Sequence, residues 1–238
     1  MIGLGTAINI GLIIAGSLCG LAFGRFMKEN LKQTLMVVSG IIVLLLGMSG
    51  AMQYMLVIVN GSLQTTGPLL MIVSMVVGAI IGEIIDLNRW ITVFGDWVKA
   101  KTGNTGDPQF THAFITASLT FTVGAMGVLG SIQDGLTGNY QTLLLKGILD
   151  GIIVMVMTSS MGKGALFSFI PVGITQWIIT AMAHIAAPLM TPGAIDNLSY
   201  VGSILIFCVG IDLIWPGKIR IANLLPAIFV AMGLTFLL

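Results

Sequence analysis

Long apolar segments are the feature that most constrains this chain. Segments of about 20 residues, enough to cross the hydrocarbon core of a bilayer as a helix, recur along all 238 residues. Only 8% of the residues are charged and 56% are hydrophobic, whereas a soluble domain has about 25% charged residues. So few charges cannot cover the surface of a globular domain in water. We therefore predict an all-α membrane protein whose surface mostly faces lipid.

The alternation of apolar segments and polar turns predicts one integral membrane domain, residues 1–238, built as a polytopic bundle of about eight transmembrane helices. Gly-rich runs in the middle of the chain, GAMGVLGSIQDG and SSMGKG, predict that some of these helices are broken at membrane depth. Residues 88–99 carry Trp, Ile, Val and Phe at helical spacing, which predicts an amphipathic helix in the membrane interface. The predicted spans are 3–24, 35–59, 68–87, 111–132, 141–162, 165–190, 198–216 and 221–238.

The basic residues fix an orientation for this bundle. With eight spans, nine of the ten Lys and Arg residues fall on one side and only Lys146 lies toward the other. Positively charged loops stay in the cytoplasm, so both termini are predicted to be extracytoplasmic. The nine are Arg25, Lys28, Lys32, Arg89, Lys99, Lys101, Lys163, Lys218 and Arg220.

A weak internal similarity indicates a repeat. The second span begins with Glu-Asn-Leu and the seventh with Asp-Asn-Leu, and both continue with paired glycines. These matches favour repeats over residues 3–87 and 165–238 that flank the central helices of 111–162, a 3+2+3 arrangement. An offset of five spans would make the two copies inverted, as in many transporters.

The densest group of polar residues within the spans lies at the fourth and fifth, and consists of Gln133, Asp134, Lys146 and Asp150. Lys146 and Asp150 are four residues apart and share a helical face, so they can pair. Charge at the bilayer centre costs about 3 kcal/mol or more. The group is therefore interpreted either as a hydrated site that binds a polar solute or an ion, or as a structural salt bridge that fixes the packing of two helices.

Five other polar residues inside apolar runs are candidate ligand groups, with interhelical or local hydrogen bonding as the alternative for each. Asp212 lies within the seventh span, and the remaining four are Asn9, Asn223, Ser159 and Ser160.

Several classes of function are not supported. No nucleophile–base–acid motif is present, so we expect no enzyme and no cofactor. Lys163 lacks the Ser or Thr that follows the lysine of a phosphate-binding loop, and His112 and His184 are not spaced as zinc ligands. A net charge of +1 without a basic patch gives no electrostatic basis for binding nucleic acid.

Four stretches of the sequence resemble a known family: GTAINIGLIIAGSLCGL, FITASLTFTVGAMGVLGSIQDGLTGN, LLLKGILDGIIVMVMTSSMGKGALFS and IRIANLLPA. Together they are similar to the YdfK/YqgA-like bacterial integral membrane proteins, domain-of-unknown-function family 554. The resemblance covers essentially the whole chain. It implies a location in the bacterial inner membrane, and the usual provisional description of that family is a transporter. It implies no substrate and no catalytic residues.

The combined expectation is a secondary transporter or channel for a small polar solute or ion. Its partners would be the lipid bilayer, that solute or ion, and a second copy of the chain in a homodimer. The alternative is a membrane protein without transport activity, in which the intramembrane charges only hold the bundle together and the protein has a structural, regulatory or partner-binding role.

Overall fold

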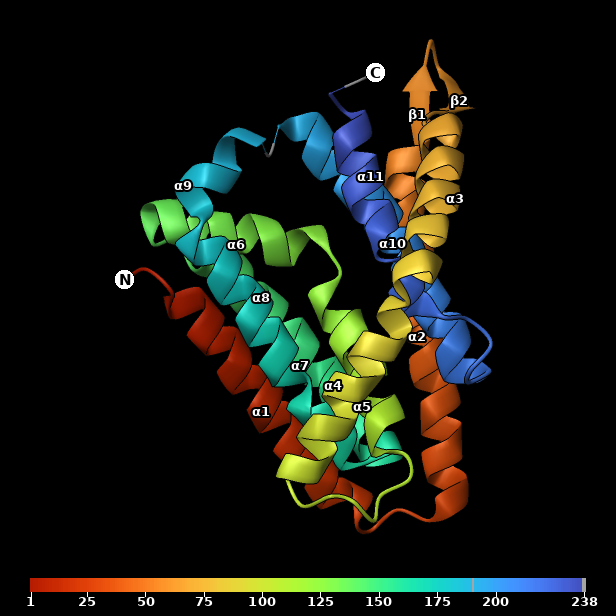
Figure 1. Cartoon of the computed structure of the whole chain (residues 1–238), viewed down its shortest axis with the longest axis vertical. Helices are drawn as coiled ribbons and strands as arrows, with labels where there is room; N and C mark the ends of the chain where they lie inside the picture. Colours follow the sequence, from red (N-terminus) through yellow and green to blue (C-terminus); the bar gives the residue numbers. More distant parts are fainter. Residues whose placement is uncertain (190, 237–238) are drawn as a thin grey trace.

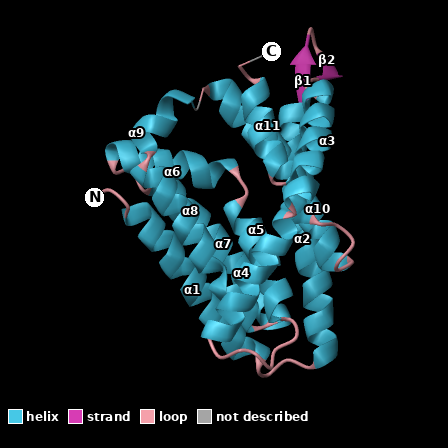
Figure 2. Ribbon diagram, viewed as in Figure 1, coloured by secondary structure: helices cyan, strands magenta, loops and turns pink. Residues whose placement is uncertain are grey.

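The computed structural model describes residues 1–189 and 191–236, and these residues are predominantly helical (Figures 1 and 2). A single β-hairpin at one end is formed by β1 (Leu56–Val59) and β2 (Ser62–Thr65). The longer helices are α1 (Leu4–Gly24), α2 (Glu29–Met55), α3 (Pro68–Ile85), α4 (Leu87–Lys101), α5 (Phe110–Thr122), α6 (Ala125–Thr137), α7 (Gln141–Met161), α8 (Phe169–Ala181), α10 (Pro192–Ile214) and α11 (Pro226–Leu234). Short helical turns are η1 (Lys163–Ser168), α9 (Ala183–Ala186), η2 (Ala187–Leu189) and η3 (Ile221–Leu224).

The predicted all-α membrane class is confirmed, but the count of eight spans is not. Within the described residues, six helical segments are long and apolar enough to cross a membrane, or seven if the bent pair α5–α6 counts as one span. The predicted eighth span is only a shorter apolar helix, Ile221–Leu234. Met190, at the end of the predicted sixth span, and residues 237–238 lie outside the described part of the chain.

The helices form two groups that lie side by side (Figure 1). In one group α2 packs along α10 and α3 packs along α11. In the other, α1 packs along α7, with α5, η1, α6 and α8 around them. Contacts between the groups are fewer and run mainly from α2 to α7 and from α10 to α5 and α6. Helices 2 and 10, which the predicted repeats would relate, are therefore packing partners, although the repeat itself stays a prediction.

Glycines allow the helices to approach closely, as small residues do in membranes. A Cβ atom added at Gly16 of α1 would lie 2.1 Å from the carbonyl oxygen of Gly151 in α7, and one at Gly82 of α3 would lie 1.8 Å from that of Asn223. Gly11, on another face of α1, has no atom within 4 Å of such a position. A side chain is therefore excluded at Gly16 and Gly82 but not at Gly11.

Two predicted boundaries are wrong. The second span was expected to continue to residue 59, but the helix ends at Met55 and β1 pairs with β2 across the Asn60-Gly61 turn. Both turn residues have positive φ angles, 50° and 77°, as a two-residue hairpin loop requires. The seventh span begins at Pro192 rather than 198, because Thr191 caps the helix by accepting a hydrogen bond from the Ala194 N–H at 3.2 Å.

Helix α4 covers the segment predicted to be amphipathic. Val98 is 1% exposed, and Gly95 packs against the ring of Phe114 in α5. The rings of Trp90 and Trp97 are, by contrast, well exposed. The helix thus has one face against the bundle and one that is free, while its position at the membrane interface stays a prediction.

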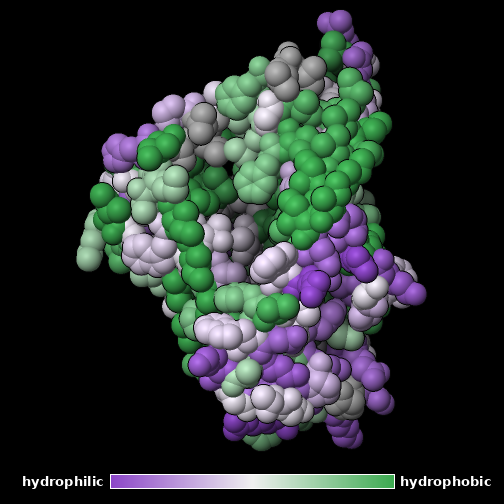
Figure 3. Space-filling model, in the orientation of Figure 1, coloured by the Kyte–Doolittle hydropathy of each residue, from purple (hydrophilic) through white to green (hydrophobic). Residues whose placement is uncertain are grey.

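Hydrophilic and apolar side chains occupy different parts of the surface (Figure 3). The loops between α1 and α2 and between α4 and α5 lie at the end opposite the β-hairpin, and this end is mostly hydrophilic (Figures 1 and 3). Apolar side chains cover much of the surface between the two ends (Figure 3). The surface is also hollowed between the two helix groups in this view.

Candidate functional site

Lys146 and Asp150 form a buried ion pair on α7, as their spacing predicted. The Lys146 Nζ donates directly to the Asp150 Oδ2, and the two side chains are 8% and 9% exposed. Asp150 is the tenth of the 21 residues of α7, so the pair lies close to the middle of the helix. Two opposite charges are thus held within a span, where an unpaired charge is costly.

The chain is broken beside this pair. Helices α5 and α6 are bent by 61° where they meet, and Gly124 between them has a φ angle of 152° that an L side chain rarely adopts. The bend brings the start of α6 against α7, so that a Cβ atom added at Gly127 would lie 3.4 Å from the Lys146 Cε. The helix break predicted for this Gly-rich run is therefore at Gly124. Gly130 instead packs against Leu143.

A cavity of about 350 Å³ lies between the two helix groups, and Lys146 and Asp150 form part of its wall. Both helix groups contribute, because α2 and α10 line one side and α5, α6 and α7 the other. Most of the lining is apolar, and no charged residue besides the ion pair is among the described lining residues. Polar lining residues are Gln53, Tyr54, Thr120, Ser199 and Ser203, and apolar ones include Val43, Leu46, Phe121, Met126, Leu149 and Ile206.

Two buried amides lie around the pair. Asn9 of α1 is completely buried, and its side chain is close to the Asp150 carboxylate without meeting the geometry of a full hydrogen bond. Gln176 of α8 is 3% exposed, and neither amide atom has a hydrogen-bond partner among the described residues. Its Nε2 approaches the position a Gly127 side chain would take, at 3.9 Å. Buried amides normally have partners, so this interior offers free polar groups.

The other two members of the predicted cluster lie elsewhere. The Asp134 carboxylate accepts a hydrogen bond from the Gly5 N–H at 3.0 Å, at the first turn of α1, where an anion is favourable. The Gln133 Oε1 accepts one from the Thr142 hydroxyl at 2.7 Å. Both residues therefore attach α6 to neighbouring helices, and the structure does not bring them to the ion pair.

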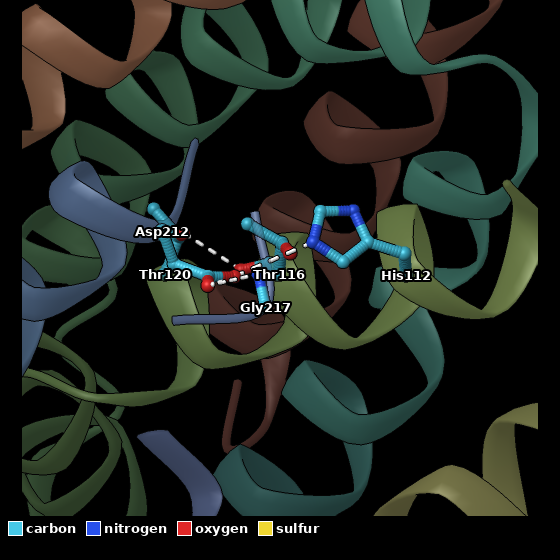
Figure 4. Close-up of polar contacts among 5 residues, drawn as sticks. All are labelled: His112, Thr116, Thr120, Asp212 and Gly217. Carbon is cyan, nitrogen blue, oxygen red and sulfur yellow. Dashed lines mark hydrogen bonds and ion pairs between the residues drawn. The ribbon is translucent and has the colours of Figure 1, made fainter. Parts of the chain in front are cut away.

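Asp212 has a partner that the sequence did not indicate. Its Oδ2 lies 3.3 Å from the His112 Nε2 on α5, and its Oδ1 accepts the Gly217 N–H at 2.8 Å (Figure 4). The Thr120 hydroxyl, about two turns beyond His112 on α5, donates within its own helix to the Thr116 carbonyl (Figure 4). His112, Asp212 and Gly217 line a second cavity of about 390 Å³. Asp212 thus fixes the turn after α10 and is separate from the α7 pair.

The remaining candidates have local roles. The Asn223 Oδ1 accepts the Asn88 N–H at 2.6 Å and so joins η3 to the start of α4. The hydroxyls of Ser159 and Ser160 both donate to the Val156 carbonyl, at 2.7 and 3.0 Å, which is the predicted alternative of bonding to their own helix. Among the described residues, no three His, Cys, Asp or Glu side chains are grouped closely enough to hold a metal ion.

Sequence reasoning missed Gln176 and the serines of α10. Gln176 lies alone in the apolar run FIPVGITQWIITA, a signal of the same kind as Asn9 in α1. Ser199 and Ser203 are on one face of α10 because they are four residues apart, and this face is turned toward the cavity.

Comparison with known proteins identifies the family. The family model described as "Protein of unknown function (DUF554)" matches residues 4–236, so the chain belongs to this family. It is 28% identical over 235 residues to the uncharacterized membrane protein YdfK of Bacillus subtilis (strain 168), covering 98% of this chain and 96% of the relative. It is 24% identical over 240 residues to the uncharacterized protein YqgA of Escherichia coli (strain K12), with the same coverage. No solved structure matches the chain significantly.

Proposed function

We propose that this member of the DUF554 family is a secondary transporter or channel that moves a small polar solute or ion across the bacterial inner membrane. The observation that carries the proposal is the buried Lys146–Asp150 pair in the wall of a cavity between two helix groups, beside the break at Gly124. Ionisable residues within a span are expensive and typically mark a path for a solute or ion. Broken helices at membrane depth are typical of transporter binding sites.

The arrangement of the groups supports the same proposal. A transporter must open its site to each side in turn, usually by movement of one bundle against another. Here the cavity lies where contacts between the two groups are fewer than those within them. Movement at this contact would change access to the ion pair while leaving the glycine-lined contacts inside each group intact. The proposed cycle includes no catalytic step and no cofactor.

Flux into proteoliposomes tests the proposal. Purified wild-type protein is reconstituted and screened for uptake of amino acids, organic acids and mono- and divalent ions. The control is a double variant, Lys146→Met with Asp150→Asn, which removes both charges together. We expect one solute or ion to enter wild-type vesicles and not those with the double variant. If no compound enters vesicles with either protein, transport is contradicted. The alternative of a structural or partner-binding membrane protein would then be favoured.

We propose further that the end carrying the basic loops is cytoplasmic and that both termini are extracytoplasmic. Single cysteines replacing Ser62 at the start of β2 and Thr105 in the α4–α5 loop, both exposed, test this in a background with Cys19 and Cys208 changed to Ala. A membrane-impermeant maleimide added outside intact inner-membrane spheroplasts should label the first and not the second. The reverse pattern, or a reporter fused after the C-terminus that proves cytoplasmic, would overturn the orientation.

A homodimer in the bilayer is also proposed as the assembly. The mass of the protein in lipid nanodiscs, measured over a range of protein-to-disc ratios, tests this. A particle that holds one copy at every ratio would contradict it.

A further inference from the structure

The chemical class of the solute follows from the charges in the cavity wall, given the function proposed above. Lys146 and Asp150 contribute opposite charges, and the described lining residues contribute no third charge. The empty site is therefore electrically neutral and internally paired. A ligand that takes either charge as its partner must replace that pairing, because both charges are less than one-tenth exposed and a buried charge without a partner is strongly disfavoured.

A solute with one charge cannot replace the pairing of Lys146 with Asp150. An organic cation bound to Asp150 would leave the Lys146 ammonium without its partner. An anion bound to Lys146 would leave the Asp150 carboxylate without its partner. Each case leaves a net charge near the midpoint of α7. The cost of such a charge at the centre of a membrane helix, about 3 kcal/mol, corresponds to affinity about a hundredfold weaker.

A solute that carries both an ammonium and a carboxylate avoids this cost. Its ammonium can pair with Asp150 while its carboxylate pairs with Lys146, so that every charge keeps a partner and the occupied site stays neutral. The cavity wall also carries uncharged polar side chains, among them Gln53, Ser199 and Ser203. They can bond the remaining lone pairs and protons of such a ligand.

The rest of the wall indicates the body of the solute. It consists mainly of aliphatic and aromatic side chains from α2, α5, α7 and α10, such as Leu46, Phe121 and Ile206. The volume of about 350 Å³ is near the lower end of the range for small-molecule sites, about 300–1,000 Å³. A single small molecule with an apolar part fits this wall.

We infer that the cavity between the helix groups binds a net-neutral zwitterion, with an ammonium and a carboxylate on one small and partly apolar body, as in a single amino acid. That the zwitterion is also carried across the membrane rests on the proposed function. Binding itself is measurable without any flux.

Thermal melting of the protein in lipid nanodiscs tests the inference. The probes are L-leucine and γ-aminobutyrate as zwitterions, and 3-methylbutylamine and 4-methylpentanoate, which keep the leucine body but have one charge each. Sodium and potassium chloride are added as inorganic ions. A ligand that binds only the folded state raises Tm with the logarithm of its concentration. We expect at least one zwitterion to do so, and the singly charged analogues to require about a hundredfold higher concentration for an equal shift.

The double variant Lys146→Met with Asp150→Asn is the matched control, because it removes both charges without leaving either unpaired. It should melt cooperatively and show no shift with the zwitterion. A singly charged analogue or a salt that stabilises wild type but not the double variant, with both zwitterions inactive, would overturn the zwitterion and leave the proposed transport site in place. If no probe shifts wild type and none enters proteoliposomes, both the inference and the proposed function are contradicted.

Discussion

Breaking the Lys146–Asp150 pair from one side should destabilise the protein far more than removing the pair altogether. Both side chains are less than one-tenth exposed, so neither charge can turn to water when its partner is lost. Removing one member of a buried pair costs about 3–5 kcal/mol, whereas replacing both with groups of similar volume is often neutral or stabilising. At about 2–4 °C per kcal/mol for a chain of this size, a single variant should lower Tm by about 6–20 °C.

A double-mutant cycle in lipid nanodiscs measures this. The four proteins are wild type, Asp150→Asn, Lys146→Met and the double variant, and each is melted without added solute. We expect both single variants to melt much earlier than wild type and the double variant to melt within a few degrees of it, which gives a coupling energy of about 3 kcal/mol or more. The reasoning is refuted if the double variant loses as much as the two single variants together, because the charges would then be stabilised by other groups. Single variants with the same Tm as wild type would also refute the reasoning.

Two further predictions concern contacts that fix α1. Gly16→Ala should lower the free energy of unfolding by about 1–3 kcal/mol, because the new methyl would meet the Gly151 carbonyl. Gly11→Ala on the same helix is the matched control, because no atom lies within 4 Å of its added Cβ. This change should be neutral or stabilise the protein by up to about 1 kcal/mol. Equal effects of the two changes on Tm would contradict the close contact of α1 with α7. Asp134→Ala should cost about 1.5–3 kcal/mol through loss of the bond to the Gly5 N–H, while any solute that stabilises wild type should shift the Tm of this variant by the same amount. A reduced solute response in Asp134→Ala would place that carboxylate in the binding site after all.

The parts of the site that were predictable depend on spacing along one helix. Lys146 and Asp150 pair because residues four apart share a face, and no knowledge of the rest of the fold is needed. Asp134 is close to them in sequence but not in space. The bend at Gly124 sets α6 at an angle, so Gly127 meets Lys146 while Asp134, about two turns further on, reaches the N-terminus of α1.

Long-range partners were not predictable. His112 and Asp212 are 100 residues apart, and a lone histidine in a sequence carries no information about the helix it will face. The β-hairpin is different, because an Asn-Gly pair such as Asn60-Gly61 is a strong signal for a two-residue hairpin turn. Because the strand before the turn, Leu56–Val59, is entirely apolar, that signal was outweighed by hydropathy, which cannot distinguish the end of a span from a strand that follows it.

The location of both partners of the ion pair on one helix has an electrical consequence. Membrane voltage acts on a protein movement only in proportion to the net charge displaced, about 2.3 kcal/mol per elementary charge at 100 mV. Because Lys146 and Asp150 lie one turn apart on α7, any movement of that helix displaces both together. Rearrangement of the empty site therefore transfers no net charge through the membrane field, and its rate should be the same in a polarised and a depolarised membrane.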